Sequence, residues 1–136
     1  KVNFPVNTGP NLRAATWREV KKTLDQQISG EGKMWLMAHP LPVIINRYRR
    51  QYYVSHDGKV RITLDDHQVV WNQRCGTTPN LAHQTALPDM IVVEAKFARD
   101  SREAANAYLQ GIPARISRHS KYINGINAVS GNGVWL

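Results

Sequence analysis

The chain has 136 residues and a formal net charge of +8, with 42% hydrophobic and 21% charged residues. This ordinary globular balance argues against a disordered chain, and the length predicts one domain over residues 1–136. A cationic surplus of this size favours a polyanionic partner, which can be nucleic acid, an anionic lipid surface or a phosphate chain. No apolar run approaches the roughly 20 residues that span a bilayer, so we expect no membrane span.

Cysteine, histidine and the first residue add three further expectations. Cys75 is the single cysteine, which excludes an internal disulfide and fits a reducing compartment such as the cytoplasm. The five histidines lack HxxxH or HxH spacing, which argues against a zinc site. The chain begins at Lys1 without an initiator methionine, so we expect a piece of a longer protein.

A helix is predicted to begin near Thr16. Thr16 and Glu19 have the spacing of a capping box, and apolar residues recur at helical intervals over residues 17–28. The Ser-Gly-Glu-Gly run at 29–32 ends this helix. Residues 34–42 are apolar and contain two prolines, so we expect them to lead into a strand.

The middle of the chain predicts strands. Residues 43–54 are rich in β-branched and aromatic side chains, which is typical of a long strand. Asp57 and Gly58 follow, and Asp-Gly between two such runs indicates a hairpin turn. Residues 59–64 form the return strand of this hairpin, and residues 68–71 predict a third, shorter strand.

The rest of the chain predicts a loop, a strand and two helices. Residues 74–88 are polar with Gly and Pro and indicate a loop, whereas residues 90–97 give the clearest strand pattern. A helix is expected over residues 101–110. A further short helix is expected over residues 115–124, with Gly125 as its end.

Two of the predicted strands are apolar on one side and charged on the other, because strand side chains alternate between faces. Glu94 and Lys96 share a face with Val92 in one strand. In the hairpin return strand, the odd-numbered positions from Lys59 to Asp65 share the charged face, with Arg61 at its centre. The simplest interpretation is a sheet face exposed to solvent.

A second interpretation places this charged face inside a curved sheet. Residues 91–95 are too apolar for an exposed edge strand, and two helices with apolar faces are available to cover the outside. Charges inside such a sheet need partners, because an unpaired buried charge costs several kcal/mol, and a bound polyanion would supply them. Glu94 among the bases then fits a ligand for Mg²⁺ or Mn²⁺. Asp65 and Asp66 can add a metal ligand, but a turn or a strand-end salt bridge is the preferred interpretation.

Two further groups of basic residues stay open at this stage. Arg47, Arg49 and Arg50 alternate with tyrosines along one strand, and periodicity alone does not decide which face looks inward. Arg118 and Lys121 are three residues apart, so on a helix they are neighbours. They either close one end of a tunnel or are solvated.

Four runs occur in an order that resembles a known family. They are RYRRQYY at 47–53, DGKVRITLD at 57–65, VVEAK at 92–96 and SKYING at 120–125. Together the runs resemble the C-terminal half of the vacuolar transporter chaperone (VTC) domain. This domain belongs to the triphosphate tunnel metalloenzymes, also called the CYTH-like superfamily.

The resemblance implies an α+β fold in which antiparallel strands form a tunnel or barrel with helices packed outside. Eukaryotic members make polyphosphate from ATP with Mn²⁺ or another divalent metal, and relatives hydrolyse triphosphate. Glu94 resembles the metal-binding glutamate of the family. The resemblance implies phosphate binding by Arg50, Lys59, Arg61, Lys96, Arg118 and Lys121, and catalytic roles for Arg50, Arg61, Lys96 and Lys121.

The chain also departs from the family. Position 118 is more often lysine in the family, and the R-x-R pair that earlier strands supply is missing from residues 1–42. The chain therefore resembles a half-domain, and a half-tunnel is expected to bind phosphate more weakly. Either the other half was removed, or it was lost in a truncated gene, or two copies of the chain complete the tunnel together.

Three functions follow as alternatives. The first is metal-dependent phosphoryl transfer on polyphosphate, triphosphate or ATP, with either water or a growing chain as the acceptor. The second is a nucleic-acid binding module, in which arginines interleaved with tyrosines track a backbone and stack bases. The third is a non-catalytic fragment of a larger protein.

Overall fold

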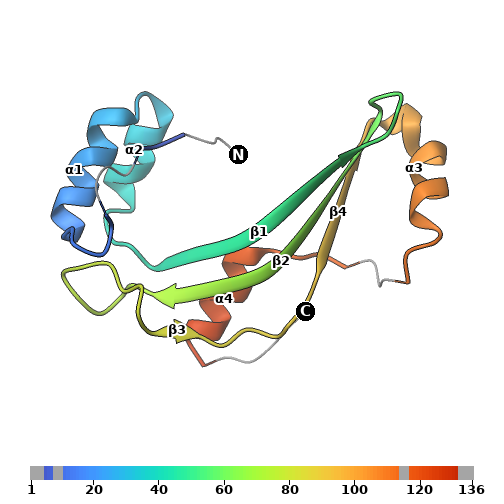
Figure 1. The fold of residues 1–136 in the computed structure, drawn as a ribbon. Helices are drawn as coiled ribbons and strands as arrows, with labels where there is room; N and C mark the ends of the chain where they lie inside the picture. Colours follow the sequence, from blue (N-terminus) through green and yellow to red (C-terminus); the bar gives the residue numbers. More distant parts are fainter. Residues whose placement is uncertain (1–4, 8–10, 114–116, 132–136) are drawn as a thin grey trace. The chain divides into compact units, whose positions relative to one another are not determined.

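The computed structural model describes residues 5–7, 11–113 and 117–131, which contain helices and a four-stranded antiparallel sheet (Figure 1). The elements in chain order are α1 (Trp17–Gln27), α2 (Glu31–Ala38), β1 (Ile44–Val54), β2 (Val60–Asn72), β3 (Gln84–Thr85), β4 (Val92–Phe97), a 3-10 turn (Arg99–Ser101), α3 (Arg102–Leu109) and α4 (Lys121–Val129). They divide into two compact units, residues 1–45 with 70–85 and residues 46–69 with 86–136.

Strand β2 is the central strand of the sheet. It pairs with β1, with β3 through residues 70–71 and with β4 through residues 60–65. No pairing between β1 and β4 closes the sheet in the part of the chain that the structure describes. The expected α+β antiparallel fold is confirmed as an open half-tunnel. The barrel expected from the resemblance is not supported, because the sheet of the described residues is open.

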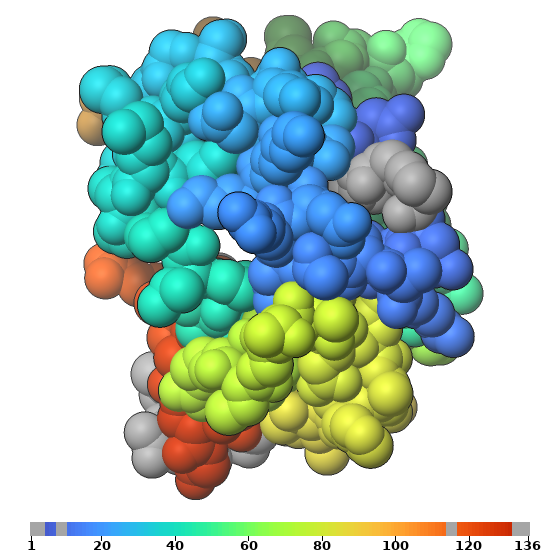
Figure 2. Space-filling model, turned by 90° about the vertical axis from the view of Figure 1, so that its left-hand side faces the viewer, coloured from blue at the N-terminus to red at the C-terminus, as the bar shows by residue number. Residues whose placement is uncertain are grey.

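In the first unit, α1 begins with the predicted capping box. The Thr16 side chain accepts a hydrogen bond from the Glu19 backbone N–H, and the Glu19 carboxylate accepts one from the Thr16 N–H at 2.7 Å. The Trp17 backbone N–H donates to the Thr77 carbonyl at 2.9 Å, which ties the helix start to the loop after β2. Figure 2 shows this loop, in yellow-green, directly below α1, in blue.

Residues 31–38 form helix α2, so the expectation that residues 34–42 only lead into a strand is wrong in part. Gly30, at φ +55°, separates α2 from α1. The Lys, Met, Leu and Ala residues of α2 are strong helix formers, and both prolines follow the last helical residue. None of the described helices combines the length and apolar character needed to cross a bilayer.

The side-chain amide of Gln73 fixes the loop after β2 through hydrogen bonds. The buried Gln73 side chain donates to the carbonyls of Trp71 and Asn80 at 3.1 and 2.8 Å, and it accepts from the Asn80 N–H at 2.7 Å. The predicted loop over 74–88 contains one short strand, β3, which pairs with Val70 and Trp71.

In the second unit, the hairpin between β1 and β2 is confirmed. Gly58 adopts φ +71°, a conformation that glycine reaches without strain, and the Ser55 N–H donates to the Val60 carbonyl at 2.9 Å. Strand β2 continues through residues 68–71, so the expected separate third strand is wrong. His67, at φ +49°, distorts the backbone without ending the strand.

Helix α3 covers the apolar side of the hairpin. Tyr108 of α3 lines a pocket of about 140 Å³ with Val60 and Ile62 of β2, and Ala105 is fully buried. Figure 1 shows α3 alongside the end of β4. The helix predicted over 101–110 is confirmed, and so is its expected place outside the sheet.

Helix α4 begins and ends later than the sequence predicts. The Ser120 side chain accepts a hydrogen bond from the Ile123 N–H, so the helix starts at Lys121. Gly125 is buried inside the helix instead of ending it. A glycine inside a helix lowers helix stability by about 1 kcal/mol relative to alanine. Of the predicted helix over 115–124, residues 115 and 116 lie outside the described residues.

Candidate polyanion site

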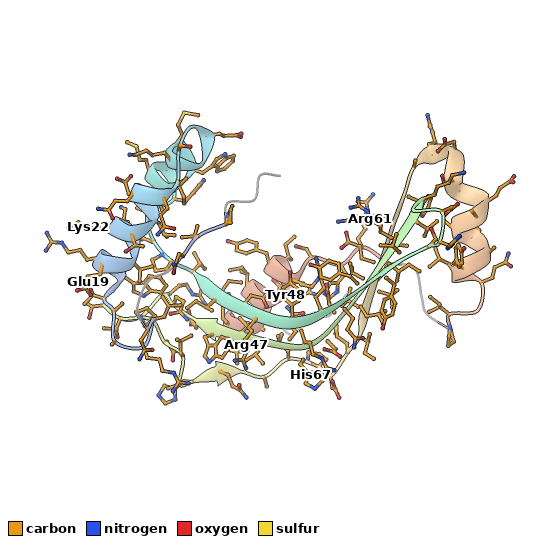
Figure 3. All side chains as sticks on the ribbon, turned by 45° about the horizontal axis from the view of Figure 1, so that its top comes forward. Glu19, Lys22, Arg47, Tyr48, Arg61 and His67 are labelled. Carbon is orange, nitrogen blue, oxygen red and sulfur yellow. The ribbon has the colours of Figure 1, made fainter. Side chains whose placement is uncertain are left out.

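One side of the sheet in the second unit gathers basic and acidic side chains, and we call it the charged face. Its members are Arg50 of β1, Arg61, Thr63 and Asp65 of β2, Glu94 and Lys96 of β4, and Lys121 of α4. Figure 3 shows Tyr48 and Arg61 on one side of the strands and Arg47 and His67 on the other. The alternation predicted from the sequence holds over residues 60–65 of β2. Arg61 and His67 are six residues apart but lie on opposite sides, because the positive φ of His67 (+49°) breaks the alternation.

Asp65 is the centre of the charged face. Arg50 donates through Nε and Nη2 to the two carboxylate oxygens at 2.5 and 2.6 Å, and Lys121 Nζ lies 2.5 Å from Oδ2. The carboxylate is only 2% exposed. The hydrogen bond from Arg50 is the largest cause that lowers the pKa of Asp65, so the group is an anion at neutral pH. The salt bridge predicted for Asp65 is confirmed, but the residue lies inside β2 and not at a strand end.

Two tyrosine rings contact Arg50 and Lys121. The Arg50 guanidinium lies 5.1 Å from the ring centroid of Tyr48 and 5.8 Å from that of Tyr52. Lys121 Nζ lies 4.9 Å from the Tyr48 centroid. Such contacts attract a cation to the face of the ring. Arg50 is thus held at one edge by a carboxylate and on its faces by aromatic rings.

Arg49 points away from the charged face. It donates to Asp66 at 2.8 and 2.5 Å, and His67 Nδ1 lies 3.0 Å from the same carboxylate. The Arg49 hydrogen bond is the main cause that lowers the pKa of Asp66 to about 2. The choice between Arg49 and Arg50, which periodicity left open, falls on Arg50 in the structure.

Glu94 lies at the open edge of the cluster. Its carboxylate is 42% exposed, 3.2 Å from Lys96 Nζ and 4.0 Å from Arg50 Nη2. Thr63 stands directly opposite Glu94 in the strand register and is 9% exposed. Its hydroxyl oxygen is buried and has no hydrogen-bond partner among the described residues. A buried hydroxyl without a partner costs about 1–3 kcal/mol, and a water or ligand atom that reached it would remove this cost.

The oxygens of Glu94 and Thr63 are the groups that could bind a divalent cation at this place. No group of three or more acidic, histidine or cysteine side chains able to hold a metal occurs in the described ranges. Mg²⁺ and Mn²⁺ do not need such a group when phosphate oxygens and water complete the shell around one or two carboxylates. The partly exposed Glu94 carboxylate fits that arrangement, whereas the Thr63 hydroxyl opposite it in the register is buried.

Arg61 and Lys96 face each other directly across β2 and β4. Like charges opposite each other destabilise an antiparallel pair. Lys96 is partly neutralised by Glu94, whereas Arg61 is exposed and forms no ion pair with any described carboxylate. On the charged face, four cations meet two carboxylates, so the face keeps a positive surplus.

Two expected site residues lie outside this cluster of contacts. Lys59 is in the turn before β2, and its backbone N–H donates to Asp57 at 3.2 Å. Arg118 is exposed and precedes α4, so the expectation that Arg118 and Lys121 are neighbours on one helix is wrong. The Ser120 cap excludes position 118 from the helix.

The sequence analysis assigned no role to three residues near these cations. Tyr48 and Tyr52 lie two residues on either side of Arg50, and strand alternation puts them on the same face as Arg50, where the structure shows them in contact with its guanidinium. His119 also lies close by: burial is the main cause that lowers its pKa, and the positive charge of Lys121 adds to this effect. No spacing signal identified His119 as part of the site.

The comparison with protein families gives one finding. A model described as the VTC domain matches residues 12–130. No curated protein and no solved structure matches the chain.

Proposed function

The chain belongs to the VTC domain family, and we propose that its charged face binds the phosphates of a linear polyphosphate or of a nucleoside triphosphate. Membership of the family indicates a polyphosphate-related function in general. The finer proposal rests on the charged face, where basic side chains from two strands of a hairpin, a third strand and a helix converge.

The observation that supports this proposal best is the pair of cations, Arg61 and Lys96, opposite each other in the register of β2 and β4. A sheet optimised for stability alone would place an acidic or neutral residue at one of these positions. A phosphate chain lying across the strands would neutralise both groups. Arginine and lysine bind phosphate oxygens through strong, charge-assisted hydrogen bonds.

The proposed reaction is metal-dependent phosphoryl transfer. Such a reaction requires positioning and charge stabilisation more than a nucleophilic side chain, which suits a face without an activated Ser or Cys among its members. Arg50, Arg61, Lys96 and Lys121 would hold the phosphate oxygens in place. A divalent cation held by Glu94 would neutralise charge on the transferred group.

Binding and turnover measurements test the proposal in two steps. Calorimetry should show that tripolyphosphate binds and that a single-stranded RNA oligonucleotide does not displace it. Stronger binding of the RNA would replace the proposal by a nucleic-acid module. With ATP and Mn²⁺, we expect release of phosphate or formation of a polyphosphate chain. Tight binding without turnover with Mn²⁺ or Mg²⁺ would limit the function to non-catalytic polyphosphate binding.

A further inference from the structure

Asp65 joins two elements that are distant in the sequence. One of its carboxylate oxygens accepts from Arg50 of β1, and the other accepts from both Arg50 and Lys121 of α4. The side chains of Arg50 and Lys121 are 23% and 18% exposed, so this three-residue cluster is largely shielded from water. Shielding strengthens the ion pairs and makes the loss of one partner costly.

The contacts to Asp65 leave donors available on both cations. The carboxylate occupies one edge of the Arg50 guanidinium, and the remaining N–H groups of that side chain are not used by Asp65. Lys121 likewise has three ammonium protons, and its Nζ contacts a single oxygen of Asp65. Asp65 therefore orients the two cations without consuming their capacity to bind phosphate.

A role as a competing anion agrees less well with the geometry. Asp65 is 2% exposed, whereas Glu94, at 42%, is the carboxylate that a ligand meets first. Tyr48 contacts both Arg50 and Lys121, which fixes the pair from a second side. The ordering of both side chains is thus complete before any ligand arrives.

We propose that Asp65 is a positioning residue that clamps the start of α4 onto β1 and β2 and holds Arg50 and Lys121 as one preorganised pair of phosphate-binding cations. This inference rests on the proposed function for the identity of the ligand. It assigns a supporting role to Asp65, an acidic side chain, within a site that binds negatively charged phosphate. Preorganised side chains bind more tightly because their ordering is not a cost of binding.

The first test compares Asp65→Asn with the unchanged chain in tripolyphosphate binding at several salt concentrations. We expect affinity at 0.15 M salt to fall roughly tenfold, since two side chains must then be ordered by the ligand. The decline of affinity with salt should become steeper, because one more cation is left for phosphate to neutralise. Unchanged affinity and salt dependence would overturn the inference. Tighter binding at every salt concentration would overturn it as well, because Asp65 would then be a competitor.

The second test measures, without any ligand, whether the ion pairs of Asp65 stabilise α4. Lys121→Met breaks only the helix side of the cluster, keeps an apolar stem for Tyr48 and leaves the pair of Arg50 and Asp65 intact. Hydrogen exchange should accelerate in α4 and stay unchanged in β4. Lys22→Met, an exposed lysine of α1, is the matched control and should change neither element.

These outcomes separate the inference from the proposed function. If the unchanged chain binds no tripolyphosphate, the proposed function fails, and hydrogen exchange alone decides whether Asp65 clamps α4. If Asp65→Asn does not fold, hydrogen exchange in Lys121→Met decides alone, because the loss of Lys121 weakens phosphate binding directly. Exchange in α4 that is unaffected by Lys121→Met would overturn the clamp.

Discussion

Replacing Arg61 by glutamine should weaken phosphate binding while leaving the fold as stable as before or slightly more stable. Arg61 faces Lys96 across the strands, and only Lys96 has an acidic partner, Glu94. Opposed like charges cost about 0.2–1 kcal/mol in a sheet, and because Arg61 is exposed we expect relief of a few tenths of a kcal/mol. A hydrogen bond to a charged group contributes about 1.5–3 kcal/mol, so affinity should fall roughly 10- to 100-fold.

Two measurements on the same protein check this prediction. Calorimetry with tripolyphosphate at constant ionic strength gives the affinity, and urea unfolding gives the free energy of unfolding. Arg102→Gln is the matched control: it removes the same charge from an exposed position at the start of α3, away from the charged face. An equal loss of affinity in both variants would show that only net charge matters, and a large loss of stability in Arg61→Gln would show that the charge opposition is not unfavourable.

Three further predictions concern the metal, acid stability and the turn. Glu94→Gln should abolish metal-dependent turnover of ATP, measured as phosphate release. It should also raise the affinity for tripolyphosphate in the absence of metal, because Lys96 loses its ion pair with Glu94. Turnover by this variant equal to that of the unchanged chain would exclude the metal role of Glu94. The folded-state pKa of Asp66, about 2, lies below its unfolded value near 4. Its contribution to stability is therefore present above pH 4 and lost between about pH 4 and 2, and in thermal unfolding the acid-side decline should be shallower in Asp66→Asn. Gly58→Ala should cost about 1 kcal/mol in urea unfolding, because φ is +71° with open space around the new methyl group, whereas Gly111→Ala should cost less.

The parts of the fold set by local patterns could be predicted from the sequence. The capping box of Thr16 and Glu19 and the turn at Gly58 depend on neighbours within a few residues, and both are confirmed. The two faces of β4 and of residues 60–65 in β2 follow from alternation, which needs only the strand assignment.

Helix α2 and the boundaries of helix α4 could not be predicted, because different sequence patterns favour different structures there. Residues 34–42 are apolar with two prolines and are expected to lead into a strand, but the helix formers over residues 31–38 produce α2. The sequence offered Gly125 as an end for the last helix, but the cap at Ser120 placed its start later. A short periodic run does not fix its own boundaries.

The central role of Asp65 is a tertiary property. Asp65 and Arg50 are paired across the hairpin, which strand register could suggest, but Lys121 reaches the same carboxylate only because α4 packs beside the sheet. No spacing in the sequence encodes that contact. The same limit applies to Arg118, whose place before the helix removes the neighbour relation that three-residue spacing implied.

The most direct measurement of the central claim is a nuclear magnetic resonance titration of arginine and lysine side chains with tripolyphosphate. The account predicts that the side-chain signals of Arg50, Arg61, Lys96 and Lys121 shift together and saturate, while Lys22 on α1 does not respond. Equal small shifts at every basic side chain, or saturation only at α1, would contradict a phosphate site on the charged face.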